Sequence, residues 1–85
     1  MIVHLVERNR FAIEHGDETA HLDYSRTGDT VNFTRTWTPP AMRGQGIAAQ
    51  LVEFGVQWAQ RENLRISASC SYVATWLERN PEALQ

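Results

Sequence analysis

The sequence contains no lysine, one cysteine and no long apolar segment. Because lysine is absent, the chain cannot form the G-x-x-x-x-G-K-[ST] loop that binds nucleoside triphosphates. A single cysteine, Cys70, excludes an internal disulfide and fits a reducing compartment. No apolar run approaches the roughly 18 residues that a membrane-spanning helix needs, and no signal peptide opens the chain. We therefore expect a cytoplasmic protein without a membrane partner.

The sequence also lacks a large excess of charge. Its net charge is −2 at pH 7, and its isoelectric point is near 5.8. Nucleic-acid-binding domains usually carry a clear basic excess, so we do not expect a nucleic acid as a partner. Of the 85 residues, 42% are hydrophobic, which is enough for the modest core of one small domain, residues 1–85.

The first half of the chain has the short alternating runs that are typical of β-strands. Four such runs are separated by turn residues, namely 2–8, 10–15, 19–26 and 30–38. In the fourth run, the alternation predicts that Arg35 and Trp37 lie on the same face as Phe33. A period of two with turns between the runs predicts an antiparallel meander.

The pattern becomes helical after Pro39 and Pro40. Apolar residues recur at helical spacing over 46–63, and this predicts a helix of four to five turns. Gly55 in its middle would cost about 1 kcal/mol relative to alanine, unless the helix packs closely on a sheet there. A strand is predicted over 65–70 and a second helix over 71–80, with Ser71 as a suitable N-cap. This order indicates an α+β fold with a mostly antiparallel sheet of about five strands and two helices after the fourth strand.

A glycine pair lies where the first helix begins, in the stretch Arg43-Gly44-Gln45-Gly46-Ile47-Ala48. Glycines let backbone N–H groups turn toward one point and let an anion approach without meeting a Cβ atom. The helix that follows adds unpaired N–H groups and the positive end of its dipole. The stretch therefore predicts a phosphate or pyrophosphate site beside the positive charge of Arg43. The competing interpretation is a turn that only closes a loop.

Two phosphate-binding motifs compete for this loop. Residues 44–49 fit the dinucleotide motif G-x-G-x-x-A, but that motif needs a parallel βαβ unit and an acidic residue about twenty positions further on. Here four antiparallel-type strands come first, and the next strand ends at Cys70. The pattern Arg43-x-x-Gly46-x-Ala48 is similar instead to the Q/R-x-x-G-x-G/A loop of the GCN5-related N-acetyltransferases, the GNAT family. Its position between a strand and a long helix is similar as well.

The wider stretch 38–83 resembles one branch of that family, the very short YjdJ-type acetyltransferase-like proteins. Their members combine V-P-x-x-x-x-G-x-G-I-G-x-x-L with P-x-C-x-[FY] and a terminal H-P-E-Y. The resemblance covers essentially the whole chain and implies a minimal GNAT fold that binds acetyl-CoA as acetyl donor, without a metal.

The resemblance also implies where the cofactor lies. The CoA pyrophosphate would be held by backbone N–H groups of the glycine loop, which consists of Arg43, Gly44, Gln45, Gly46, Ile47 and Ala48. The end of the preceding strand, at Trp37 and Thr38, would splay from its neighbour and pair with the pantetheine amides. The acetyl group would then lie between that strand and the strand that ends at Cys70, close to an amine acceptor.

Two residues are candidates for the chemistry. Cys70 matches the family's cysteine and could accept the acetyl group or donate a proton to the CoA thiolate. In the alternative interpretation, Cys70 has no chemical role and packs as a small buried hydrophobic residue. Tyr72 could also donate a proton. In the alternative interpretation, its aromatic ring only packs the second helix onto the sheet.

The chain departs from the family pattern at several positions. Relatives usually read His-Thr where this chain reads Arg35-Thr36, so a histidine base cannot be carried over. Leu77 lies where many larger members have a proton-donating tyrosine. Ala68 replaces a proline, and Asn80 replaces the histidine of His-Pro-Glu. These departures weaken the expectation of turnover more than the expectation of CoA binding.

The residues alone do not identify a general base. His4, His15 and His21 have no metal-ligand spacing and are interpreted as surface or strand residues. Glu14 and Asp23 could orient water or a substrate amine, and the sequence favours neither.

The sequence therefore predicts an acetyl-CoA-dependent N-acetyltransferase that acts on a primary amine. A peptide or protein amine is favoured over a small molecule, because the chain ends without the final strand pair of larger members and should have an open acceptor site. A monomer is compatible with this interpretation. The alternatives are a CoA-binding regulatory module with little or no turnover, and an interaction domain whose glycine loop binds nothing.

Overall fold

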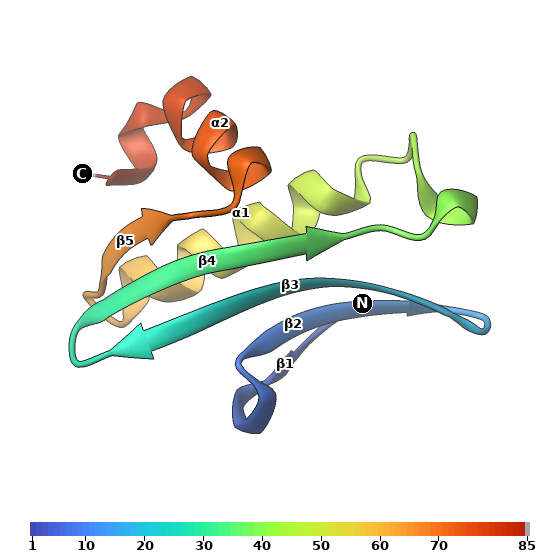
Figure 1. Ribbon diagram of the computed structural model, residues 1–85, viewed down its shortest axis with the longest axis horizontal. Coiled ribbons are helices and arrows are strands. Elements are labelled where there is room, and N and C mark those ends of the chain that lie inside the picture. The colour runs from blue at the N-terminus through green and yellow to red at the C-terminus, as the bar shows by residue number, and fades with distance from the viewer. Residues whose placement is uncertain (85) are drawn as a thin grey trace.

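Five strands and two helices make up the computed structural model, which describes residues 1–84 (Figure 1). In chain order the elements are β1 (Ile2–Leu5), β2 (Arg10–His15), β3 (Glu18–Thr27), β4 (Thr30–Trp37), α1 (Ile47–Arg61), β5 (Arg65–Ala68) and α2 (Ser71–Arg79). Two short 3₁₀ turns lie between these elements, η1 (Val6–Arg8) and η2 (Pro40–Met42), and a third, η3 (Pro81–Leu84), follows α2.

The strands form one sheet in the order β1-β2-β3-β4-β5. The first four are antiparallel neighbours, and β5 lies parallel to β4 after the chain has crossed over through α1. Helix α1 covers one face of the sheet, and α2 packs beside it against β4 and β5 (Figure 1). The predicted α+β fold, with two helices after the fourth strand, is confirmed.

The first strand is shorter than the predicted run 2–8. Leu5 is the antiparallel partner of Arg10, so the residues between them must reverse the chain. They do so through η1 and through Asn9, which has a left-handed φ of 52°. The carbonyl of Asn9 then accepts a 3.0 Å hydrogen bond from the N–H of Tyr24.

Helix α1 approaches the sheet most closely at Gly55. A Cβ atom there would lie 3.0 Å from Leu22 Cδ2, 3.1 Å from Phe33 Cε1 and 3.3 Å from Phe11 Cε2. These three side chains are fully buried in the core. The glycine that weakens the helix is thus the residue that lets it pack on the sheet.

Strand β4 contains a bulge that the sequence pattern does not reveal. Tyr24 pairs with Phe33, but Asp23 pairs with Arg35, so Thr34 is an extra residue in β4. An extra residue breaks the period of two and moves every later side chain to the opposite face.

The bulge changes what each face of the sheet carries. Trp37 is the cross-strand partner of His21, and both lie on the face away from α1 with Arg35. Thr36 pairs with Leu22 and faces the helices. The prediction that Arg35 and Trp37 share a face with Phe33 is therefore wrong, because it assumed an unbroken alternation.

Replacing Gly55 with valine should lower the free energy of unfolding by about 2 kcal/mol, because overpacking a filled core typically costs about 1–3 kcal/mol. Urea or thermal unfolding measures this change. The matched control is Gln57→Val at an exposed position of the same helix, where a change within about 0.5 kcal/mol is expected. Equal losses in the two variants would contradict close packing at Gly55.

Candidate functional site

Strands β4 and β5 separate from each other at one end of the sheet. Their parallel pairing ends at Phe33 and Ala68. The Phe33 carbonyl accepts the N–H groups of both Ser69 and Cys70, each at 3.1 Å, as the chain turns away from β4. Strand β4 continues to Trp37, so among the described residues its 34–37 segment has no strand partner on the β5 side. The sequence-based expectation of a splayed strand end agrees with this geometry.

The side chain of Asn32 fixes the point at which β5 ends. Its Oδ1 accepts the Ser69 N–H at 2.9 Å and the Ser67 hydroxyl at 3.3 Å. Its Nδ2 donates to the Ser69 hydroxyl at 3.1 Å. No local pattern in the sequence indicates this role, because it depends on a contact between residues more than thirty positions apart.

The glycine loop leads from β4 to the first turn of α1. Gly44 and Gly46 have left-handed φ values of 79° and 74°. Within residues 1–84, no atom beyond their immediate neighbours would lie within 4 Å of a Cβ atom built on either glycine. The loop needs glycine for its backbone conformation, and the space above it is open.

Gly46 is the N-cap of α1 and cannot contribute a capping side chain. No side chain in the part of the chain that the structure describes caps this helix, and its first turn has no acidic residue. The first N–H groups of a helix have no intrahelical partner, and the helix dipole makes this end positive. The start of α1 is therefore suited to an anion.

A cleft of about 230 Å³ lies against this loop. Its lining comes from η2, the loop and the starts of both helices, namely Thr38, Met42, Arg43, Gly44, Gly46, Ile47, Ala48, Ala49 and Tyr72. Six of the residues predicted to bind the cofactor are thus brought together with Tyr72. Trp37 and Gln45, also predicted to bind, are not in the lining.

Arg43 ties the loop to the end of β4. Its Nε donates a 2.9 Å hydrogen bond to the Thr38 carbonyl, and its guanidinium lies 5.4 Å from the centre of the Trp37 ring. A cation over an aromatic face is attracted by the ring's electrons. Trp37 thus supports Arg43, which is one of the residues that line the cleft.

Cys70 lies at the divergence of β4 and β5, half-buried, with Sγ 3.7 Å from the Thr36 hydroxyl. It is the N-cap residue of α2, whereas the sequence suggested Ser71, which is the first residue of the helix. Burial raises the pKa of the thiol. Backbone N–H groups of Val73 and Tyr72 and the Thr36 hydroxyl outweigh burial, and the net pKa lies below its ordinary value.

Tyr72 occupies the first turn of α2, and its side chain is 42% exposed. The buried residues of this helix are Val73 and Leu77. Tyr72 therefore does not pack the helix onto the sheet. Its side chain lines the cleft beside the glycine loop.

The face of the sheet away from α1 carries a polar cluster that sequence analysis did not find. Arg10 binds both carboxylate oxygens of Asp23, with Nε 2.6 Å from Oδ1 and Nη2 3.2 Å from Oδ2. Nδ1 of His21 lies 3.4 Å from the same Oδ1. His21 and Asp23 are two residues apart on β3 and so share a face, and the register between β2 and β3 brings Arg10 to Asp23.

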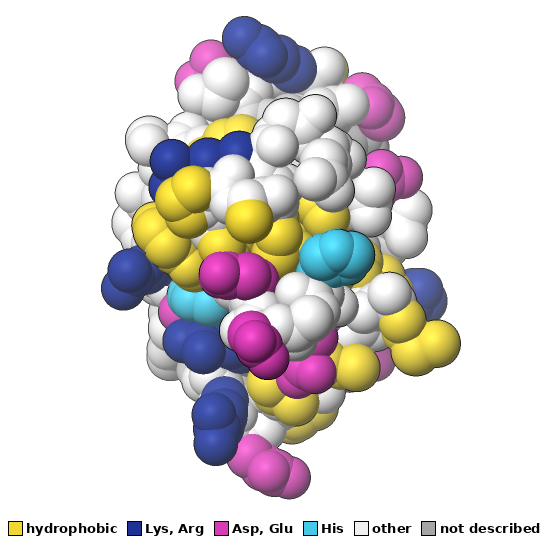
Figure 2. All heavy atoms as spheres, turned by 90° about the vertical axis from the view of Figure 1, so that its right-hand side faces the viewer, with side chains coloured by type: hydrophobic (Ala, Val, Ile, Leu, Met, Phe, Trp, Pro, Cys, Tyr) yellow, Lys and Arg dark blue, Asp and Glu magenta, His cyan; other side chains and the backbone are white. Residues whose placement is uncertain are grey.

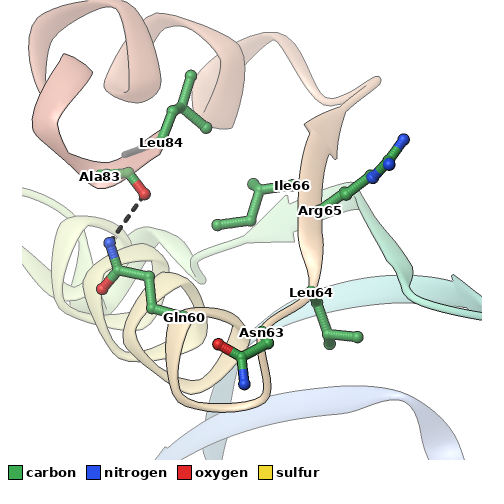
Figure 3. A pocket seen from close by; sticks show the side chains of 7 residues that line it. All are labelled: Gln60, Asn63, Leu64, Arg65, Ile66, Ala83 and Leu84. Carbon is green, nitrogen blue, oxygen red and sulfur yellow. Dashed lines mark hydrogen bonds between the residues drawn. The ribbon is translucent and has the colours of Figure 1, made fainter.

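A larger cleft of about 500 Å³ lies at the other end of α1, between that helix, β5 and η3 (Figure 3). It is lined by Gln60, Asn63, Leu64, Arg65, Ile66, Ala83 and Leu84. Gln60 Nε2 donates a 2.8 Å hydrogen bond to the Ala83 carbonyl and fixes η3 to α1. This cleft has neither a glycine loop nor a thiol, so the candidate chemistry lies at the other end of the helix.

The end of the molecule seen in Figure 2 exposes a group of hydrophobic side chains with acidic, basic and histidine side chains around them. Within the described residues, no three His, Cys, Asp or Glu side chains are placed to hold a metal ion. In the same part of the chain, no helix has the length and apolar character needed to cross a membrane.

Comparison with known proteins identifies the family. The model of the GCN5-related N-acetyltransferases matches residues 10–85. The chain belongs to this family. Protein NATD1 of Xenopus tropicalis is 32% identical to this GNAT chain over 65 residues, which cover 75% of the chain and 60% of that protein. Protein NATD1 of Bos taurus is 33% identical over 51 residues, which cover 60% of the chain and 45% of that protein. The chain thus spans only 60% or less of these curated relatives.

The fold comparison agrees with the family. The NMR solution structure of a GCN5-like protein from Staphylococcus aureus superposes with a TM-score of 0.77 at 27% identity. The match covers 98% of this GNAT chain and 82% of the other.

Cys70 should react with iodoacetamide as a thiol of lowered pKa. Because it is the sole cysteine, the pH dependence of alkylation reports on this site alone. We expect a midpoint below the value of about 8.5 for an unperturbed cysteine, and Thr36→Val should shift the midpoint upward. The urea-unfolded chain provides the reference, and a native midpoint equal to it would contradict the environment described.

Proposed function

We propose that this chain binds acetyl-CoA at the glycine loop and transfers the acetyl group to a primary amine. The observation that carries the proposal is the uncapped start of α1, with two left-handed glycines, beside an edge of β4 that has no strand partner. Membership of the GNAT family supports the same activity.

The loop fits the pyrophosphate of CoA. Backbone N–H groups at a helix N-terminus bind phosphate well, because hydrogen bonds and the helix dipole both favour the negative charge. The open space over Gly44 and Gly46 admits a phosphate oxygen that a Cβ atom would exclude. Arg43 adds a positive charge to the lining of the cleft.

The unpartnered segment 34–37 of β4 fits the pantetheine arm. Its backbone groups toward β5 lack the ladder hydrogen bonds of a paired strand, and an arm with two amide groups can replace them as a short strand would. Such an arm, starting at the loop, would extend toward Cys70 at the divergence of the two strands. The acceptor would be a peptide or protein amine that reaches this open end of the sheet.

Cys70 is our candidate for the proton donor to the CoA thiolate. When the amine forms its bond to the acetyl carbon and the C–S bond breaks, the sulfur needs a proton. A thiol whose pKa is lowered by the start of α2 and by Thr36 matches a leaving thiol of similar acidity. Tyr72 lies in the cleft with the loop, and we assign it to contact with the cofactor.

An alternative function is supported by α2. Leu77, which stands where many larger members have a proton-donating tyrosine, is 8% exposed and part of the core. A chain that binds CoA without turning it over would act as a regulatory module.

Calorimetric titration with acetyl-CoA, and separately with CoA, tests the binding site. We expect micromolar affinity for both, and its loss in Gly46→Val. The matched control is Gly28→Val, because Gly28 also has a left-handed φ, 59°, and an open space above it but lies in the β3–β4 turn. Both variants carry a similar backbone strain, of about 1–2 kcal/mol, and only the first blocks the loop. Equal affinity in the two variants would refute the loop assignment.

Two further variants separate the candidate proton donors. Cys70→Ser should lower kcat by about a hundredfold, the usual scale for a general acid, with the Kd of acetyl-CoA unchanged. Tyr72→Phe should raise the Kd, because the contact with the cofactor loses the hydroxyl. It should leave kcat within about threefold, because a contact that is equally strong in the ground state and the transition state does not change kcat. A larger fall in kcat for Tyr72→Phe than for Cys70→Ser would make the phenol the donor.

A further inference from the structure

The uncovered face of the sheet carries three polar side chains in series, Arg10, Asp23 and His21. Their side chains are 33%, 23% and 12% exposed. Arg10 holds Asp23 through two hydrogen bonds of 2.6 and 3.2 Å, so the carboxylate is fixed in position. A bidentate bond of this kind sets orientation as well as charge.

The position of the imidazole needs a reason. Nδ1 of His21 is buried and, among residues 1–84, has no hydrogen-bond partner. A buried polar atom without a partner costs about 1–3 kcal/mol. It faces Asp23 Oδ1 at 3.4 Å, and a small rotation would complete an Nδ1–H···O hydrogen bond. Catalytic hydrogen bonds are often this long before substrate binds.

The surroundings keep the imidazole neutral. Burial lowers the pKa of His21, Asp23 raises it, and Arg10 and Arg35 lower it again, with a net shift downward. With the proton on Nδ1 directed at Asp23, the lone pair of Nε2 is available to accept another. A histidine that acts as a base has this arrangement, in which Nδ1 donates to a carboxylate and Nε2 accepts the proton.

The cluster also lies in the right part of the sheet. His21 is the cross-strand partner of Trp37, and Asp23 is the partner of Arg35. Both are therefore one strand away from the unpartnered 34–37 edge of β4. Helices α1 and α2 occupy the other face, so within the described chain an acceptor can approach the divergent strands from the His21 side (Figure 1).

We infer that His21, oriented by Asp23 and Arg10, accepts the proton from the acceptor amine. The inference rests on the proposed acetyl transfer. The amine nitrogen forms a bond to the acetyl carbon and the C–S bond breaks. The ammonium group of the acceptor loses two protons in all: one goes to Nε2 of His21 and frees the attacking lone pair, and the second is released after the nitrogen has bonded to the acetyl carbon. The CoA sulfur takes a proton from the Cys70 thiol, and the second proton from nitrogen restores that thiol, so atoms and charge balance. Arg35 cannot replace His21, because a guanidinium keeps its proton.

Two amine probes test this role. The ε-amine of a short lysine peptide is protonated at pH 7 and needs a base, whereas hydroxylamine is already unprotonated. For His21→Gln we expect about a hundredfold lower kcat with the lysine peptide, little change with hydroxylamine, and an unchanged Kd for acetyl-CoA by calorimetry. Mass spectrometry of the acetylated probes measures the rates after subtraction of the uncatalysed reaction. Asp23→Asn should lower the lysine-peptide rate in the same sense.

The matched control is His15→Gln, because His15 is exposed at the end of β2, and its rates should equal those of the wild type. Equal losses with both probes, or no loss in His21→Gln, would overturn the role of His21. Wild-type protein that binds acetyl-CoA but acetylates neither probe would overturn the proposed acetyl transfer, and with it the role of His21. Absence of acetyl-CoA binding in the wild type would overturn the proposed cofactor site as well.

A second measurement does not depend on the variants folding. The nitrogen shifts of the His21 ring in the wild type, measured by NMR, report which nitrogen carries the proton. We expect the Nδ1–H tautomer, and a ring that is mainly Nε2–H at neutral pH would overturn the inference.

Discussion

One extra residue in β4 decides which side chains meet at the candidate site. The bulge at Thr34 turns the end of the strand over, so Thr36 faces the helices while Arg35 and Trp37 face away from them. Without it, Trp37 would point toward α1 and could not support Arg43. Thr36 would point away from Cys70, which it now contacts. The bulge is therefore needed both for the contact of Trp37 with Arg43 and for the contact of Thr36 with Cys70.

A second constraint acts on β5. The Asn32 side chain and the Phe33 carbonyl together hold Ser69 and Cys70 in a turn. That turn ends the pairing of the two parallel strands and begins α2 at the same point. The gap between the strands, the position of the thiol and the start of the helix therefore depend on one small group of hydrogen bonds. Close packing at Gly55 fixes α1, which begins directly after the glycine loop, to the sheet.

Much of the fold could be predicted from the sequence, because periodicity is a local property. The strands, both helices and the glycine loop follow from patterns within a few residues. The bulge at Thr34 could not be predicted, because the residues on either side of it, 31–37, read as an unbroken alternation. The early end of the first strand depends on the pairing of Leu5 with Arg10, which only the assembled sheet defines.

The candidate site was predictable to a similar degree. The loop residues and Cys70 have a recognisable spacing, and the structure brings most of them to one end of the molecule. In the group of Arg10, Asp23 and His21, the alternation of β3 places His21 and Asp23 on one face, but no spacing indicates their contact with Arg10. Arg10 and Asp23 are 13 positions apart in the chain and meet because β2 and β3 pair in one register. A single sequence contains no local signal for such a contact.

The lengths of the strands have a consequence for behaviour at high concentration. The two outer strands, β1 and β5, have four residues each, whereas the inner β3 has ten. Exposed sheet edges recruit other chains into aggregates, and short edges offer them few backbone groups. The unpaired stretch at the end of β4, residues 34–37, is an inner edge: β3 pairs with it on one side, and β5 has turned away on the other. Such a sheet can present backbone hydrogen bonds to a small molecule while it resists lateral growth into fibrils.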